Sequence, residues 1–273
     1  MINVVLLLIV TFLPVYLIGL FVYKKDKEKE PGKLLGKFFI FGMLSCIPTL
    51  IFELLLGSFF PPEESMDMVT LFIYVFVTIA MIEEFFKWIF TYLIGFNNKE
   101  FDHVYDIIVY AVFVALGFAA LENLLYVMTS DISTGLVRAV TAIPGHASDA
   151  IVMGYFLGLA KVAQVNNDDA KMKRNIVKSV IYPTVAHTIY DFCVFSKLPI
   201  LILLFLVWLV FIYIYSIKKI KKISSIEGEL TDVKVDNYYI CPKCRGKLDK
   251  MYCSNCRQYI SESQINNSNN LTQ

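Results

Sequence analysis

Three charged side chains interrupt a long apolar stretch in the first half of the chain. Residues 69–94 are long enough to cross a bilayer, which needs about 20 apolar residues, yet they include Glu83, Glu84 and Lys87. A charge near the bilayer centre costs about 2.5–3.5 kcal/mol on insertion scales. We therefore expect these three groups to face a protein interior or a water-filled cavity, and we look for chemistry there first.

The composition of the chain indicates a membrane protein. Hydrophobic residues make up 57% of the sequence and charged residues 18%, whereas soluble domains have about 25% charged residues. The net charge of +1 says little about the partners of the protein. We predict an all-α polytopic membrane protein with about seven transmembrane helices. The expected spans are residues 2–23, 38–56, 69–94, 107–128, 136–162, 176–195 and 199–217.

Basic residues predict the orientation, because loops rich in Lys and Arg stay in the cytoplasm. Such residues cluster in segments 24–37, 171–178 and 218–222, which fall on one side of the membrane if there are seven spans. The loop 57–68 on the other side has no Lys or Arg and is acidic. We predict a protein of the plasma membrane with its N-terminus outside and its C-terminus in the cytoplasm.

The third and fourth spans carry candidate catalytic glutamates. Glu83 and Lys87 are four residues apart with the glutamate on the favourable N-terminal side, and Glu84 is turned by about 100° from Glu83. The two carboxylates therefore need not share a role. In the fourth span, Phe118 and Glu122 share one helix face. The alternatives are a structural ion pair between helices and a Glu122 that extends outward to the lipid interface.

The fifth and sixth spans each carry a histidine followed by a carboxylate three or four residues later. His187 has Asp191 at i+4, and such a carboxylate can orient the imidazole ring and fix its tautomer. Because Pro144 disfavours a continuous helix, we expect residues 136–143 to form a short separate piece and His146 to lie in the first turn of the next helix. The alternatives are a capping cluster around His146 and a hydrogen-bonded pair that joins helices.

Glu and His together in a hydrophobic bundle can activate water, because Glu accepts a proton and His relays it or stabilises an oxyanion. The series on four successive spans resembles the PrsW-type intramembrane proteases, which are related to type II CAAX prenyl endopeptidases and Abi-type membrane proteins. The related families have an arginine where this chain has Lys87 and a histidine where it has Glu122. These two differences favour the PrsW branch over a prenyl-protein protease. The resemblance covers about residues 69–195, and the matching residues are Glu83, Glu84, Lys87, Phe118, Glu122, His146, His187 and Asp191.

The resemblance implies an intramembrane endopeptidase that makes the first cut in a membrane-anchored regulatory protein, such as an anti-sigma factor, during envelope stress. It implies that Glu83 is the general base that acts on water. Glu84 with Lys87 would hold this base in place, and Glu122 would assist it. The expected partners are this protein substrate and the lipid bilayer, and no nucleic acid is expected.

The same resemblance implies that His146 completes a proton relay and that His187 with Asp191 polarises the scissile carbonyl. A metal-based reaction is an open alternative, since one Glu, two His and a water would satisfy a catalytic zinc. The chain has no His-Glu-x-x-His motif, which favours a metal-free glutamate mechanism.

A second, small domain follows the membrane part. Two Cys-x-x-Cys motifs separated by eight residues are typical of a structural zinc ribbon, and the expected cytoplasmic location keeps the thiols reduced. We predict a transmembrane protease domain at 1–217 with core motifs in 69–195, a linker at 218–237, a zinc ribbon at 238–260 and a disordered tail at 261–273. The expected zinc ligands are Cys241, Cys244, Cys253 and Cys256.

Two other classes of protein remain open. A transporter or channel would use Glu83, Glu122 and His187 as a proton or cation path, although the sequence shows neither the pseudo-repeats nor the paired broken helices that are common in transporters. A non-catalytic membrane scaffold would recruit partners through the zinc ribbon.

Overall fold

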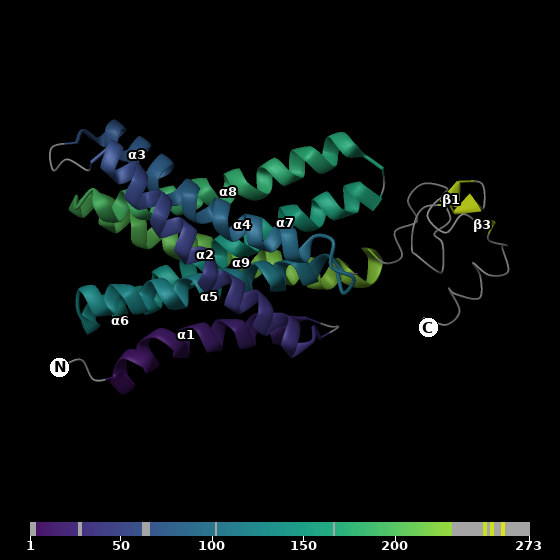
Figure 1. The fold of residues 1–273 in the computed structure, drawn as a ribbon, viewed down its shortest axis with the longest axis horizontal. Coiled ribbons are helices and arrows are strands. Elements are labelled where there is room, and N and C mark those ends of the chain that lie inside the picture. The colour runs from purple at the N-terminus through teal and green to yellow at the C-terminus, as the bar shows by residue number, and fades with distance from the viewer. Residues whose placement is uncertain are drawn as a thin grey trace.

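A computed structural model describes residues 4–26, 29–61, 66–101, 103–165 and 167–230, together with three short strands near the C-terminus. Its long helices run along one axis of a bundle (Figure 1). The helices are α1 (Val4–Lys25), α2 (Gly32–Phe59), α3 (Met68–Val75), the π-helix η1 (Phe76–Ala80), α4 (Met81–Gly95), α5 (Val104–Thr129), α6 (Ile132–Val140), α7 (Ala142–Val165), α8 (Asp169–Phe195) and α9 (Pro199–Leu230).

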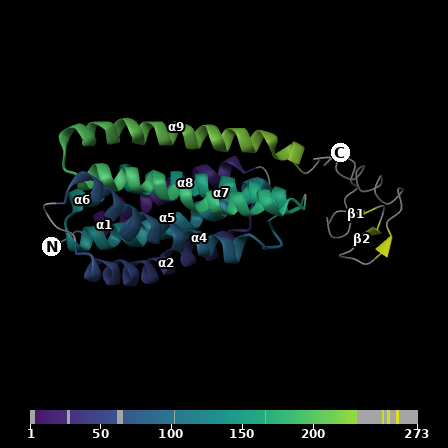
Figure 2. The same ribbon diagram turned by 90° about the horizontal axis from the view of Figure 1, so that it is seen from above.

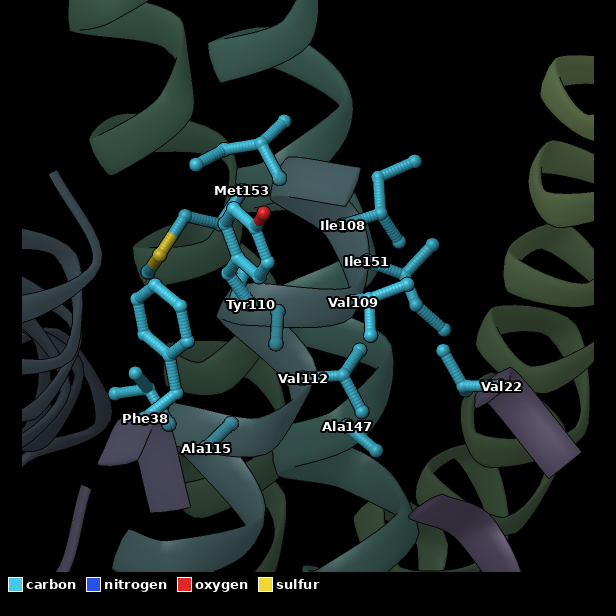
Figure 3. Close-up of a cluster of buried hydrophobic side chains, with 14 of the residues drawn as sticks. Val22, Phe38, Ile108, Val109, Tyr110, Val112, Ala115, Ala147, Ile151 and Met153 are labelled. Carbon is cyan, nitrogen blue, oxygen red and sulfur yellow. The ribbon is translucent and has the colours of Figure 1, made fainter. Parts of the chain in front are cut away.

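Helix α5 is the centre of the bundle, and most of its side chains are buried. Helices α2, α7, α1 and α4 pack against it, while Figure 2 shows α9 along one side of the bundle and α2 along the opposite side. Phe38 of α2 stacks on Tyr110 of α5 with ring centroids 4.3 Å apart. Figure 3 shows how Val22 of α1 and Met153 of α7 join them in this core.

Glycines let α2 and α5 approach each other closely. A methyl group on Gly42 of α2 would overlap the backbone of Val114, and one on Gly117 of α5 would overlap the backbone of Phe39. Small residues at such crossings allow helix backbones to come into direct contact in membrane proteins. The crossing therefore fixes how the C-terminal halves of α2 and α5 lie relative to each other.

Substituting Gly42 by alanine is expected to destabilise the protein by about 1–3 kcal/mol, because the added methyl group must push apart two backbones that cannot yield locally. Gly36 on the same helix is the matched control, since a methyl group there meets nothing within 4 Å. Thermal unfolding in detergent should show a lower melting temperature for Gly42→Ala and no decrease for Gly36→Ala. Equal melting temperatures for the two variants would contradict this view of the crossing.

Among the residues that the structure describes, five helical segments are long and apolar enough to cross a membrane: α1, α2, α3 to α4 as one stretch, α5 and α9. The protein is therefore a multi-pass membrane protein with an all-helical membrane part. Helices α7 and α8 have 24 and 27 residues, which is also sufficient length, but they carry many polar residues. Most of α7 is buried against neighbouring helices, so it needs no apolar surface of its own. The seven-span arrangement stays a prediction.

Two predicted spans differ from a simple helix. The stretch predicted at 136–162 forms two helices, α6 and α7, which meet at Thr141. The expected break is confirmed, but it lies three residues before Pro144, which is inside α7. The stretch predicted at 69–94 contains the π-helix η1 directly before the glutamate pair. Thr78 within η1 donates its hydroxyl to the Tyr74 carbonyl at 2.7 Å. Such π segments are rare in helices and are frequent at functional sites.

The C-terminal ends of α1, α7 and α9 lie at the same end of the bundle (Figure 1). These ends adjoin the three lysine-rich segments 24–37, 171–178 and 218–222. The predicted topology requires the three lysine-rich segments to lie at one end of the bundle. That this end faces the cytoplasm stays a prediction. We call this end the lysine-rich end.

After the bundle in sequence, the described residues include three two-residue strands. They are β1 (Leu248–Asp249), β2 (Tyr252–Cys253) and β3 (Gln258–Tyr259), paired antiparallel in that order. Cys241, Cys244 and Cys256 lie outside the described residues, as do residues 261–273, and only the backbone of Cys253 is described. The zinc ribbon therefore stays a prediction. Helix α9 continues to Leu230, well into the segment predicted as a linker.

Candidate active site

A cavity of about 530 Å³ lies inside the helix bundle. Its walls come from the C-terminal halves of α2, α5 and α8, from the end of α3, η1 and the start of α4, and from α6 and the N-terminal part of α7. These parts lie away from the lysine-rich end. The cavity brings together residues that the sequence places on four different predicted spans: Glu83, Phe118, Glu122, His146, His187 and Asp191.

Lys87 lies behind the cavity at the centre of the charged cluster. Its side chain is 2% exposed, and its Nζ is 2.5 Å from Glu84 Oε1 and 3.3 Å from Glu83 Oε2. The same ammonium lies 4.5 Å from the centroid of the Phe118 ring. The expected pairing of Glu83 with Lys87 is confirmed, but the shorter contact is to Glu84. The two carboxylates therefore differ: Glu84 is held in the interior, whereas Glu83 lines the cavity.

His187 of α8 connects the buried pair of Lys87 and Glu84 to the cavity. Its Nδ1 is 2.9 Å from Glu84 Oε1, while its Nε2 is 3.3 Å from Asp191 Oδ2 and 3.8 Å from Glu83 Oε2. The predicted contact between His187 and Asp191 is confirmed. Because a carboxylate only accepts hydrogen bonds, the ring donates Nδ1–H to Glu84. Its other nitrogen is directed toward the side of Glu83.

His146 of α7 has a partner on each nitrogen. Its Nδ1 is 3.1 Å from Lys87 Nζ, and its Nε2 is 2.9 Å from Glu122 Oε2. An ammonium can only donate and a carboxylate can only accept, so this network assigns the proton to Nε2 and leaves Nδ1 as the acceptor. The alternative of a capping cluster is not what the structure shows, because the His146 ring contacts side chains of α4 and α5 rather than the start of its own helix.

Arg138 of α6 completes the site and was missed in the sequence. Its Nη2 is 2.6 Å from Glu122 Oε2, and its guanidinium lies 3.8 Å from the centroid of the Tyr126 ring. The Glu122 side chain is only 17% exposed, so the alternative in which it extends outward to the lipid interface is wrong. An arginine inside a predicted span was the available signal, because such a charge requires a partner.

The donor atoms of the cluster also fit a metal ion. One carboxylate oxygen of Glu83 and one ring nitrogen each of His146 and His187 lie within 4.8 Å of one another, which is the ligand set of many catalytic zinc sites. Glu122 and Glu84 each contact one ring nitrogen of these two histidines, as outer carboxylates do in such sites. Lys87 contacts two of these three groups, so its ammonium and a metal ion would compete for them. A second group with the same spacing is Glu84, Asp149 and His187.

Comparison with known proteins assigns the chain to a family. Residues 30–217 match the family described as PrsW family intramembrane metalloprotease. The chain is 36% identical over 184 residues to Protease PrsW of Oceanobacillus iheyensis, covering 67% of this chain and 80% of that protein. It is 32% identical over 187 residues to Protease PrsW of Geobacillus kaustophilus, covering 67% of this chain and 76% of that protein. It is 33% identical over 193 residues to Protease PrsW of Clostridioides difficile, covering 68% of this chain and 78% of that protein. No solved structure matches. The chain therefore belongs to the PrsW family of intramembrane proteases.

Proposed function

We propose that this protease hydrolyses a peptide bond of a membrane-anchored protein inside the cavity, with Glu83 as the general base that activates water. The observation that carries this proposal is the position of Glu83, which lines the cavity while Lys87 and His187 lie beside it. A carboxylate so placed can accept a proton from a water molecule in the cavity. Glu84 contacts the same Lys87 and His187 and so keeps both in position.

His187 is placed to stabilise the charge that develops during hydrolysis. Its Nε2 lies on the side of Glu83 and Asp191, so a proton on this nitrogen can be donated to the oxygen of the scissile carbonyl as it becomes an oxyanion. His146 has both nitrogens occupied. It therefore acts by linking Lys87 to Glu122, and Glu122 is itself paired with Arg138. These contacts complete the polar network behind the general base, Glu83.

Metal-assisted hydrolysis is a second candidate, because the donor atoms of Glu83, His146 and His187 lie close enough together to hold one ion. A metal bound there would polarise the carbonyl and lower the pKa of a water molecule. Metal analysis of the purified protein separates the two candidates when it is combined with Glu83→Gln. The metal candidate predicts that this variant loses one equivalent of metal that the wild type contains.

The position of the cavity supports a substrate that is cut toward the outer face of the membrane. The cavity lies away from the lysine-rich end, and that end is expected in the cytoplasm. A single-span protein cleaved there would be separated from its outer domain. We propose a membrane-anchored regulatory protein such as an anti-sigma factor as the substrate class, as the resemblance to PrsW-type proteases implies.

Reconstitution tests this function. Purified full-length protein in liposomes is incubated with single-span reporter proteins, and the products are identified by mass spectrometry of their new termini. The proposal predicts a cut inside or at the edge of the reporter's apolar span. Ion flux across the liposomes without cleavage of any reporter would favour the transporter alternative and contradict the proposal.

The C-terminal zinc ribbon is a separate proposal with its own test. Four cysteines in two Cys-x-x-Cys pairs hold zinc as a closed structural site, so Cys241→Ser is expected to lower the zinc content of the full-length protein by about one equivalent. Cys193→Ser is the control, because this free cysteine is buried in α8. Atomic absorption or plasma mass spectrometry measures the difference. Unchanged zinc in Cys241→Ser rules out the ribbon.

A further inference from the structure

One acidic residue on the cavity wall belongs to none of the motifs. Glu53 lies in the apolar sequence of α2, a helix that contributes no other charged group to the cavity. It shares a helix face with Cys46, Thr49 and Leu50, at the spacing of one helical stripe, and all four residues line the cavity. The carboxyl group of Glu53 therefore faces the same space as Glu83.

Glu53 lacks the partners that the other charged groups of the cavity have. Its Oε1 is enclosed and has no hydrogen-bond partner, and no cation lies within 4.0 Å of it, among the residues that the structure describes. The neighbouring hydroxyl of Thr49 donates to the Ser45 carbonyl at 2.9 Å and is not directed to Glu53. A carboxyl group without a partner in such surroundings is costly. Because the Glu53 side chain lines the cavity, a ligand that enters the cavity can supply the missing partner.

The cations of the site are already committed to other acids. Lys87 contacts Glu83 and Glu84, and Arg138 contacts Glu122. The wall formed by α2 thus carries a carboxyl group that no cation of the described residues contacts. A positively charged group that enters the cavity with the substrate can form an ion pair with this carboxyl group, and such a pair is stronger there than in water because the surroundings are apolar.

We propose that Glu53 is a specificity-determining residue that binds a lysine or arginine side chain of the substrate close to the scissile bond. This inference rests on the proposed function, because it assumes that the substrate segment lies in the cavity. Glu53 lies on α2, whereas Glu83 lies on α4 and the histidines on α7 and α8, so the substrate segment would run between α2 and the catalytic residues. Glu53 selects the substrate, and Glu83 and its neighbours perform the hydrolysis.

The test uses a reporter protein that the wild type cleaves, made in three forms that carry Lys, Gln or Glu at each position flanking the cut. The inference predicts that at one position the wild type cleaves the Lys form about 10- to 100-fold more efficiently than the Gln form, as expected for a hydrogen bond to a charged group. The preference should lie mainly in KM. Glu53→Asp should keep it, Glu53→Gln should remove it, and Glu53→Lys should favour the Glu form.

Controls separate this inference from the function on which it rests. Glu100→Gln, which changes a partly exposed glutamate outside the cavity, should keep the wild-type preference. A melting temperature of Glu53→Gln close to that of the wild type, together with measurable cleavage of the Gln form, shows that this variant is folded and active. If Glu53→Gln cleaves the Lys and Gln forms in the wild-type ratio, the inference fails and the proposed function stands. If the wild type cleaves no reporter, both fail.

Discussion

Replacing Glu83 by glutamine is expected to reduce peptide-bond cleavage by about 100- to 10,000-fold, the contribution usually made by general acid–base catalysis. Glutamine has nearly the same shape as glutamate, but its amide cannot accept a proton from water. The other contacts of Lys87, to Glu84 and His146, remain in the variant. Initial rates of reporter cleavage in liposomes measure the effect.

The folded state provides the control for this variant. Lys87 keeps its shortest ion pair when Glu83 is neutralised, so expression and melting temperature should stay close to those of the wild type. Glu83→Asp keeps a carboxylate in a shortened side chain and should retain more activity than Glu83→Gln. Cleavage by purified Glu83→Gln at a rate near that of the wild type would remove Glu83 as the base.

Replacing Lys87 by methionine is expected to destabilise the protein by about 3–5 kcal/mol, the usual cost of removing one partner from a buried ion pair. Lys87 contacts Glu83, Glu84 and His146, and the variant would leave two carboxylates in the interior with one cation fewer. Methionine has a similar length, so the loss arises from charge rather than from a large cavity. Thermal unfolding in nanodiscs or detergent measures the change.

Lys161→Met is the matched control for this substitution. Lys161 is half-buried in α7 and donates to the Phe96 carbonyl at 3.0 Å, and no carboxylate lies within 4.0 Å of it among the described residues. Its loss should cost about 1 kcal/mol, as for a single hydrogen bond. If Lys87→Met were no less stable than Lys161→Met, the cluster would not be held together by its charges.

Contacts within one helix could be predicted from spacing alone. The pairs of Glu83 with Lys87 and of His187 with Asp191 follow from the period of the helix, and both are present. The convergence of the four helices could be expected only because unpaired charges are too costly in lipid. That argument applies to all charged groups together. It could therefore not predict which glutamate lies closest to Lys87, which in the structure is Glu84 rather than Glu83.

Contacts between helices that depend on rotation and depth could not be predicted in the same way. Arg138 lies on α6, and its contact with Glu122 depends on the break at Thr141 that separates α6 from α7. The orientation of Glu53 toward the cavity depends on the face that α2 presents, and close packing on glycines sets this face. The π-helix before Glu83 changes the rotation of the glutamate pair relative to residues 68–75, and a pattern of apolar residues contains no signal for it.

The central claim is that the cavity is where the substrate is bound and cut. Site-specific photo-cross-linking in the Glu83→Gln background tests it most directly, with the reactive group placed either at Ile79, which lines the cavity, or at Leu93, which is exposed on the outside of α4. The probe is a single-span reporter that the wild type cleaves. We predict cross-links to the reporter's cleaved segment from Ile79 and not from Leu93. Cross-links from Leu93 alone would place the reporter outside the cavity and contradict the account.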